Sequence, residues 1–163
     1  MASRRKGRIL AFQALYSWDV CESIRAHNDE ASGSFIPRGL LDFSWAQSDA
    51  PLDEELLAFS SLLVTGTVEN IKAVDDMISK HLQNWDINRL NRVDLALIRM
   101  STYTLMFQAD ISPSIVIDEA IDISKEFGTD DSYRFVNGVL DNIRKTLAST
   151  VSGNTITELV VPK

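Results

Sequence analysis

Apolar residues recur at intervals of three and four along most of this chain. That spacing is the period of one face of an α-helix. It predicts helices that start near Ser3, cover about 53–83 and 93–107, and continue over about 114–127 and 131–147. No segment shows the strict alternation that is typical of a strand. The pattern therefore predicts an all-α protein.

The run from Phe127 to Asp141 contains the end of one predicted helix and the start of the next. Gly128 directly follows a helical pattern, and glycine suits the left-handed position that commonly closes a helix. Asp130 and Asp131 then offer side-chain oxygens to the free amides of a new first turn. We therefore expect a helix to end at Gly128 and the next one to be capped by these aspartates.

Asn137 and Gly138 interrupt the apolar stripe of the last predicted helix. Glycine in a helix costs about 1 kcal/mol relative to alanine, and asparagine competes for backbone hydrogen bonds. The more common explanation is close contact with another helix over Gly138, with Asn137 hydrogen-bonded to that neighbour. The alternative is that Asn137 and Phe135 are exposed and contact a ligand.

Two segments are expected to lie outside the helices. Residues 28–51 are rich in glycine, proline and small polar residues, which indicates a loop with at most a short helix. The apolar residues of this loop are expected to pack against the helices or a partner. The end of the chain is small and polar, so we expect a flexible tail over 150–163. A single domain at 1–149 would have one lobe at about 3–85 and a second at about 86–149.

Length and composition fit one domain. With 163 residues, 45% of them hydrophobic, the chain can bury roughly two thirds or more of its unfolded surface. The single cysteine, Cys21, excludes an intramolecular disulfide. Polar residues follow the apolar run at 9–12 too soon for a signal peptide or a membrane span. We expect a cytoplasmic protein with no membrane contact.

Four cations stand close together before the first apolar positions: Arg4, Arg5, Lys6 and Arg8. The whole chain has a net charge of -7, and without these four it stands at -11, with 12 basic against 23 acidic residues. A helix anchored in a core would present the cations to phosphate groups with little ordering cost. The cluster indicates local contact with nucleic acid, although cations near a terminus are often only solvated.

The sequence contains no recognisable catalytic motif. It lacks a glycine-rich phosphate loop and a serine nucleophile motif. Asp118, Glu119 and Asp122 lie at helical spacing on a polar face, which usually means a solvated surface. His27 and His81 have no second histidine or cysteine at ligand spacing. We therefore expect no enzyme activity, no cofactor and no metal site.

Two residues inside apolar runs need an explanation. Arg99 is expected to pair with a carboxylate, with Asp94 or Glu119 as the candidates, because an unpaired buried charge is costly. Gly66 lies near the middle of the helix predicted over 53–83. It is expected either to kink that helix or to admit a close neighbour.

Several runs together resemble the NusB family of transcription antitermination factors. Arg-Arg-Lys-Gly-Arg at 4–8 and Gln-Ala-Leu-Tyr-Ser-Trp at 13–18 look like the opening of that family. Ile-Asp-Glu-Ala-Ile at 117–121 is similar to its second half. The most specific run is Phe-Val-Asn-Gly-Val-Leu-Asp at 135–141, and the resemblance covers about residues 4–145.

The resemblance implies an all-α bundle of two antiparallel three-helix lobes. It also implies a non-catalytic factor that binds boxA-type single-stranded RNA together with NusE, a small-subunit ribosomal protein. RNA polymerase would then resist termination on ribosomal RNA operons, with the elongation complex as an indirect partner. By position, the resemblance assigns RNA contact to Arg4, Arg5, Lys6, Arg8, Gln13, Tyr16, Lys125, Asp131, Tyr133, Arg134 and Phe135.

Two features depart from the family's pattern. Segment 28–51 is longer than the family needs, and Lys6 stands where an arginine would bind phosphate bidentately. The family's domain also occurs fused to RNA cytosine methyltransferases, but this chain has no room for a catalytic domain, so we expect a free-standing factor. Two alternatives stay open. One is a helical adaptor whose basic N-terminus binds an acidic protein, and the other is self-association into a homodimer.

Overall fold

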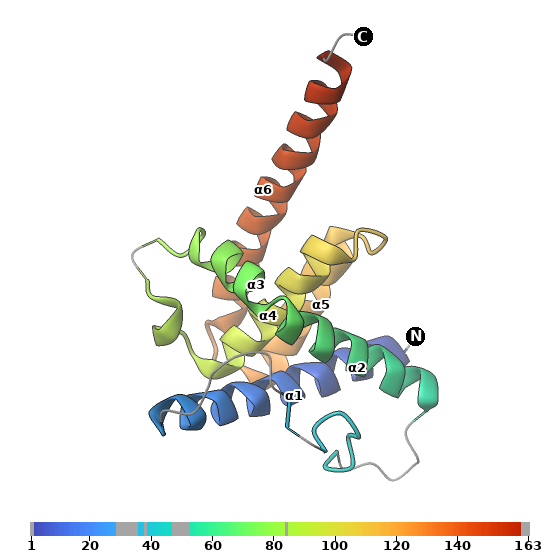
Figure 1. Ribbon diagram of the computed structural model, residues 1–163, viewed down its shortest axis with the longest axis vertical. Helices are drawn as coiled ribbons and strands as arrows, with labels where there is room; N and C mark the ends of the chain where they lie inside the picture. The colour runs from blue at the N-terminus through green and yellow to red at the C-terminus, as the bar shows by residue number, and fades with distance from the viewer. Residues whose placement is uncertain (1, 29–35, 38, 47–52, 84, 161–163) are drawn as a thin grey trace.

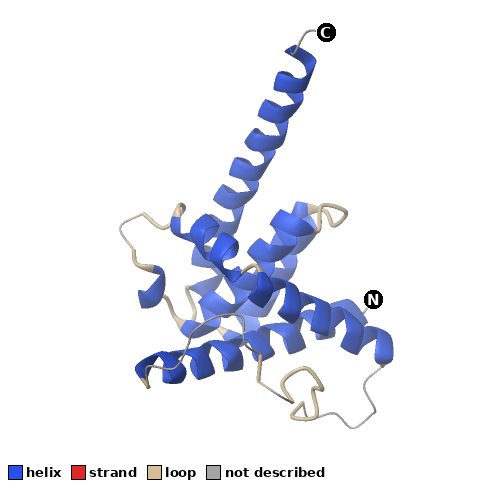
Figure 2. Ribbon diagram, viewed as in Figure 1, coloured by secondary structure: helices blue, strands red, loops and turns tan. Residues whose placement is uncertain are grey.

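The computed structural model describes residues 2–28, 36–37, 39–46, 53–83 and 85–160. Within these residues the chain is all-α and contains no β-strand, as the sequence predicts (Figures 1 and 2). The elements in order are α1 (Ala2–His27), α2 (Glu54–Glu69), α3 (Ile71–Ser79), the 3-10 helix η1 (Ile87–Arg89), α4 (Arg92–Phe107), α5 (Pro113–Phe127) and α6 (Ser132–Val160). None of these helices is long and apolar enough to span a membrane.

Helix α4 lies at the centre of the fold (Figure 1). Four consecutive side chains, Leu95 to Ile98, are each at most 2% exposed. A helix that is apolar on all sides must be surrounded by other elements. Helices α1, α2, α3, α5 and α6 all pack against α4. One continuous hydrophobic core therefore joins the first and second halves of the chain.

Helix α1 is anchored along most of its length by α2 and α4. Near its start, Ser60 of α2 donates a hydrogen bond from its Oγ to the carbonyl of Gly7 at 2.9 Å. A Cβ at residue 7 would lie only 2.6 Å from the Phe59 ring, so glycine permits this close approach. Further along, α1 buries Leu10, Ala11, Phe12, Ala14, Leu15 and Trp18.

The single helix predicted over 53–83 is wrong, because the chain bends at Asn70. This residue leaves the helical conformation, with φ −109° and ψ 21°, and it separates α2 from α3. Its side-chain amide donates to the carbonyl of Gly66 at 2.8 Å, which offers the chain an alternative to a continued helix. At Gly66 itself, the second of the two expectations is confirmed. A Cβ there would lie 2.2 Å from the phenol ring of Tyr103, so the glycine admits α4 as a close neighbour.

The turn between α5 and α6 differs in detail from the sequence prediction. Gly128 does close α5, but its backbone is extended, with φ −93° and ψ −171°, and not left-handed. Glycine is needed there because a Cβ would meet the Ser132 Oγ at 2.6 Å and the Ser124 carbonyl at 2.7 Å. In the described part of the chain, no hydrogen bond joins the side chain of Asp130 or Asp131 to the first turn of α6. Instead, the Ser132 Oγ accepts a hydrogen bond from the Thr129 amide at 2.9 Å.

The close helix contact expected over Gly138 is wrong. No atom of the described structure lies within 4 Å of a Cβ built on this glycine. Asn137 is also exposed and has no hydrogen-bond partner among the described residues. The fold therefore gives no packing reason for this pair, and the alternative, contact with a ligand, stays a prediction.

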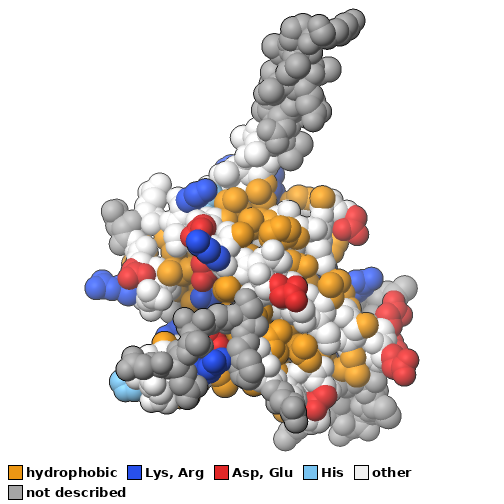
Figure 3. Space-filling model, viewed as in Figure 1, with side chains coloured by type: hydrophobic (Ala, Val, Ile, Leu, Met, Phe, Trp, Pro, Cys, Tyr) orange, Lys and Arg blue, Asp and Glu red, His pale blue; other side chains and the backbone are white. Residues whose placement is uncertain are grey.

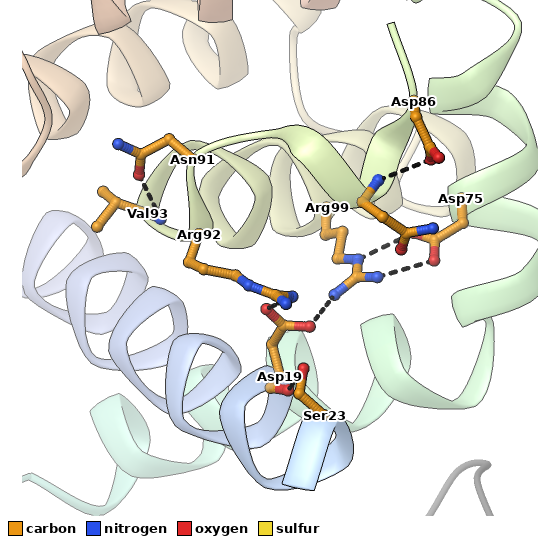
Figure 4. A network of polar contacts seen from close by, with 9 residues as sticks. Asp19, Ser23, Asp75, Asp86, Asn91, Arg92, Val93 and Arg99 are labelled. Atoms are coloured by element: carbon orange, nitrogen blue, oxygen red, sulfur yellow. Dashed lines mark hydrogen bonds and ion pairs between the residues drawn. The ribbon is translucent and has the colours of Figure 1, made fainter. Parts of the chain in front are cut away.

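The partners expected for Arg99 are also wrong. Its guanidinium binds Asp75 of α3 through two hydrogen bonds of 2.9 Å and Asp19 of α1 at 3.1 Å. Asp19 also accepts from Arg92 at 2.7 Å, so the network joins α1, α3 and α4 (Figure 4). The candidate Asp94 is buried elsewhere, where desolvation raises the pKa of its carboxyl. Helical spacing cannot indicate such pairs, because the two partners of Arg99 come from other helices, Asp19 from α1 and Asp75 from α3.

The described part of the long segment packs against the helices, which confirms that expectation. Phe43 is 1% exposed, and Ile36, Leu40, Leu41 and Ala46 pack against the core. Trp45 stays exposed and donates from its ring nitrogen to the Leu40 carbonyl at 3.0 Å. Residues 29–35 and 47–52 of the predicted loop lie outside the described residues.

The predicted tail at 150–163 is helical over its first part, and its flexibility stays a prediction. Helix α6 continues as far as Val160, and its last turns stand away from the other helices (Figure 1). The helix can continue because no proline follows Ser132 until Pro162. Residues 161–163 of the predicted tail lie outside the described residues.

Alanine at Gly66 and alanine at Gly138 are expected to change the stability of the protein in opposite directions. Gly66→Ala should destabilise the protein by about 1–3 kcal/mol, because the new methyl group collides with Tyr103 in a packed core. Gly138→Ala should stabilise it by about 0.5–1 kcal/mol, because the helix gains propensity and meets nothing. Thermal or urea unfolding of the two variants checks both signs. A destabilised Gly138→Ala variant would contradict the open surroundings of this residue.

Candidate nucleic-acid interface

The four N-terminal cations lie on the first turns of α1 but differ in their surroundings. Lys6 is exposed, and no ion pair or hydrogen bond holds its ammonium group within the described structure. Arg4 is exposed and lies over the Phe59 ring, 4.4 Å from its centroid. Arg8 is half-buried, and its side chain is only 12% exposed. Lys6 and Arg4 are therefore the cations most available to a phosphate group.

Arg5 is held by two carboxylates of α5. Its Nε and Nη2 donate to the two carboxylate oxygens of Glu119, each at 3.0 Å. Nη2 also donates to Asp122 at 2.8 Å. Half of the Arg5 side chain remains exposed, at 48%, so solvent still reaches the guanidinium. We call this group, Arg5 with Glu119 and Asp122, the α1–α5 clamp.

The surroundings of the clamp shift the pKa values of Glu119 and of the neighbouring Arg8. The hydrogen bond from Arg5 is the main reason why the pKa of the Glu119 carboxyl lies below its usual value. Arg8 lies 3.9 Å from Glu119, and burial lowers the pKa of its guanidinium from the ordinary value. Both groups remain charged at neutral pH. The Glu119 carboxyl is ionised because its pKa is lowered, and the Arg8 guanidinium is protonated because arginine keeps its proton throughout that range.

An open pocket of about 930 Å³ separates the cations from the turn that joins α4 to α5. We call it the N-terminal pocket. It is lined by Arg4, Arg5, Lys6, Arg8 and Ile9 of α1, and by Asp110, Ile111, Ser112, Ile115 and Glu119 of the α4–α5 turn and α5. Its volume can hold several atoms of a sugar-phosphate chain. The predicted cation cluster therefore lies beside an accessible space, which the acidic residues Asp110 and Glu119 also line.

Gln13 and Tyr16 lie further along the same helix. Helices α1 and α5 run in the same direction here, since Arg5 meets Glu119 and Phe12 packs on Phe127 with ring centroids 5.4 Å apart. A second pocket of about 260 Å³ lies beside this aromatic pair. It is lined by Phe12, Gln13, Tyr16, Ser17, Trp45, Val93 and Phe127. We call it the aromatic pocket, and its exposed rings offer flat apolar surface.

The second predicted patch, at the start of α6, is brought together only in part. Lys125 lies over the Tyr133 ring, 5.2 Å from its centroid. Arg134 donates from its Nε to the Tyr133 hydroxyl at 2.9 Å. Asp131 is exposed beside them, whereas Phe135 is half-buried and packs against the core. The patch thus offers two cations around one phenol ring, together with a repelling carboxylate.

The charged side chains are mixed over the face shown in Figure 3. Basic and acidic groups alternate there, with hydrophobic side chains exposed between them. This view agrees with the net charge of -7, which leaves no excess of cations for a general nucleic-acid surface. Attraction to phosphate must therefore be local.

Glu119 and Asp122 were missed by sequence reasoning, which assigned them to a solvated surface. The available signal was weak. It consisted of two acids at a spacing of three on one helix face and a cluster of cations at the start of the chain. Only the packing of α5 beside α1 brings them to Arg5. Asp118, the third acid of that group, is exposed and makes no ion pair within the described structure.

The described helices and this site define an all-α, six-helix class of protein in which the first helix carries a basic turn. The chain belongs to the NusB family, a family of non-catalytic transcription antitermination factors, and the family model matches residues 5–145. It is 50% identical over 141 residues to the transcription antitermination protein NusB of Treponema denticola, covering 86% of this chain and 95% of that protein. The NusB protein of Treponema pallidum (strain Nichols) is 47% identical over 143 residues, which cover 88% of this chain and 93% of that protein.

Solved structures agree with the fold. NusB of T. maritima has a TM-score of 0.69 and 35% identity, covering 87% of this chain and 90% of that chain. A complex of the antitermination factors NusB and NusE with dsRNA contains a chain with a TM-score of 0.68 and 27% identity. That match covers 90% of this chain and 98% of that chain. The family resemblance and the all-α fold predicted from the sequence are therefore confirmed.

The clamp makes a prediction for the titration of Glu119. Replacing Arg5 by alanine removes the hydrogen bond that chiefly lowers the Glu119 pKa, so this pKa should rise toward its ordinary value of 4.5. Carboxyl carbon shifts in NMR, followed against pH, measure it. Asp141 serves as the control, because its pKa is lowered mainly by Arg144 and should not change. An unchanged Glu119 titration would show that the clamp does not form in solution.

Proposed function

We propose that this protein binds boxA-type single-stranded RNA together with NusE and thereby makes RNA polymerase resist termination. Ribosomal RNA operons are the proposed setting, and the cytoplasm is the proposed location. The observation that carries the proposal is the N-terminal pocket, where the cations of α1 line an open space beside a rigidly held helix. A structural relative that binds NusE and RNA supports it.

Phosphate contact would come chiefly from Arg4 and Lys6. Both are exposed, whereas Arg8 is half-buried and Arg5 is held in the clamp. Two neutralised phosphates give a slope of log affinity against log salt of about −1.4 for a single strand, and four would give about −2.8. The salt dependence of binding therefore reports how many of the four cations reach the RNA.

Contacts with bases would come from the rings and amides beyond the cations. Tyr16 is 39% exposed and Trp45 is 40% exposed in the aromatic pocket, which Gln13 of α1 also lines. Stacking of an unpaired base on an aromatic ring contributes about 1–3 kcal/mol. The patch of Lys125, Tyr133 and Arg134 offers a further ring with two cations.

NusE would add the affinity that this chain lacks. The charge of -11 outside the N-terminal cluster repels RNA, so the chain alone is expected to bind weakly. A second protein that contacts both this chain and the RNA strengthens the complex by linkage.

Replacing Arg4 and Lys6 together by alanine should weaken binding to a labelled boxA oligonucleotide on the order of tenfold at low salt, because two phosphate contacts are lost. The salt slope should become less steep by about 1.4. Fluorescence anisotropy at several salt concentrations measures both quantities.

The matched control replaces Lys72 and Arg89, two exposed cations of α3 and η1, and changes the net charge equally. It should leave RNA binding nearly unchanged. Equal losses for the two double variants would show that only overall charge matters. No RNA binding by the unaltered chain would instead favour the adaptor with an acidic protein partner.

Adding NusE should tighten boxA binding by about 5- to 150-fold, the usual range of coupling between two ligands. The titration is run with and without NusE, using the single-stranded oligonucleotide and its duplex. The duplex matters because the related complex contains dsRNA. Equal affinities with and without NusE would contradict the coupling, and tighter binding of the duplex would contradict the preference for a single strand.

A further inference from the structure

We infer that Glu119 and Asp122 increase the selectivity of this protein for boxA RNA over RNA of unrelated sequence. They do so by keeping Arg5 from binding phosphate groups, which every RNA has. The inference rests on the proposed RNA binding and goes beyond it, because it assigns a role to two acids of α5. Both lie across from the cations of α1, and Glu119 also lines the N-terminal pocket.

The geometry of the clamp blocks the strongest way in which an arginine binds phosphate. A guanidinium has five N–H donors and two edges that can each hold an anion bidentately. Glu119 occupies the edge formed by Nε and Nη2, with both hydrogen bonds at 3.0 Å. The other edge needs a hydrogen on both Nη atoms, and Nη2 already donates its second one to Asp122 at 2.8 Å. A phosphate can therefore reach only single donors on Nη1 unless the clamp opens.

The clamp also changes the local charge. Arg5 brings one positive charge, and its two carboxylate partners bring two negative ones. Glu119 lies 3.9 Å from Arg8 as well, so it reduces the attraction of a second cation. Since phosphate binding depends on local positive charge, this arrangement weakens the contribution that every RNA gains, whatever its bases.

Selectivity follows because boxA-type RNA and RNA of unrelated sequence use phosphate contacts differently. An unrelated strand can slide along the protein until a phosphate lies against any available cation. A boxA-type strand is fixed in register by its base contacts, so it gains from Arg5 only if that register places a phosphate there. Blocking Arg5 therefore weakens unrelated RNA more than boxA RNA.

The clamp is not a switch that works near neutral pH. Arg5 lowers the pKa of the Glu119 carboxyl, so this group stays ionised until well into the acidic range. Among the described residues, Arg5 and Arg8 both favour the charged form of Glu119. The effect on RNA is therefore constant over the physiological range.

The test uses the full chain with Glu119→Gln and Asp122→Asn, each alone and combined. The probes are a labelled boxA oligonucleotide and a labelled oligouridine of the same length. The combined variant should bind oligouridine about two- to fivefold more tightly at low salt, the range expected for releasing one exposed ion pair. Its salt slope should become steeper by about 0.7, because Arg5 becomes able to neutralise one phosphate. The ratio of boxA affinity to oligouridine affinity should fall.

Matched controls separate the clamp from a general change in charge. Glu126→Gln and Asp118→Asn alter the same helix by the same charges, but neither residue makes an ion pair within the described structure. They should change oligouridine binding much less. Arg5→Ala should weaken binding only slightly in the unaltered chain but cancel most of the gain in the combined variant, because the two acids act through Arg5.

The outcomes distinguish this inference from the proposed function. If the unaltered chain binds neither RNA, the proposed function fails, and the inference fails with it. If the chain prefers boxA RNA but the combined variant shows no gain for oligouridine, or equal gains for both RNAs, only the inference is overturned. A gain for oligouridine that depends on Arg5, with a lower boxA preference, supports it.

Discussion

The burial of α1 against α2 and α4 is the constraint on which the basic surface depends. Most of the stability of a helix in a protein comes from tertiary packing of its apolar face, so the first turns of α1 keep their shape because later turns are packed. Leu15 and Trp18 supply that packing, and the Ser60 bond to the Gly7 backbone extends it to the start of the helix. The helix backbone that carries the cations is therefore ordered before any partner binds, which lowers the entropic cost of binding.

Charge works at two levels in this protein. Inside, the network of Asp19, Asp75, Arg92 and Arg99 joins three helices and leaves no buried charge of its members unpaired. At the surface, the clamp around Arg5 uses the same chemistry in water, where an ion pair contributes little stability. The α1–α5 clamp therefore contributes little to the stability of the fold, and its main effect is to reduce the binding of anions to Arg5.

Local pattern was sufficient to predict most of the helices, because their apolar spacing and their terminal residues are encoded within each segment. It failed where the answer depends on contacts between segments. The bend at Asn70 comes from a side-chain bond that propensity does not reveal, and Gly128 is required by Ser132 rather than by its own conformation. The cation cluster could be found from the sequence, but the acids that hold Arg5 could not. The residues around Arg5 in the sequence do not indicate that α5 lies beside α1 in the fold.

The contact between Gly66 and Tyr103 has a geometric consequence for the far end of α2. With only a hydrogen atom between them, the glycine backbone and the phenol ring fix the spacing of α2 and α4 at that point. The same helix carries Phe59 and Ser60, which hold Arg4 and the Gly7 backbone. Because an α-helix is stiff, a displacement of α2 at Gly66 would also move Phe59 and Ser60, about two helical turns away, and with them the first turns of α1 that carry the cations.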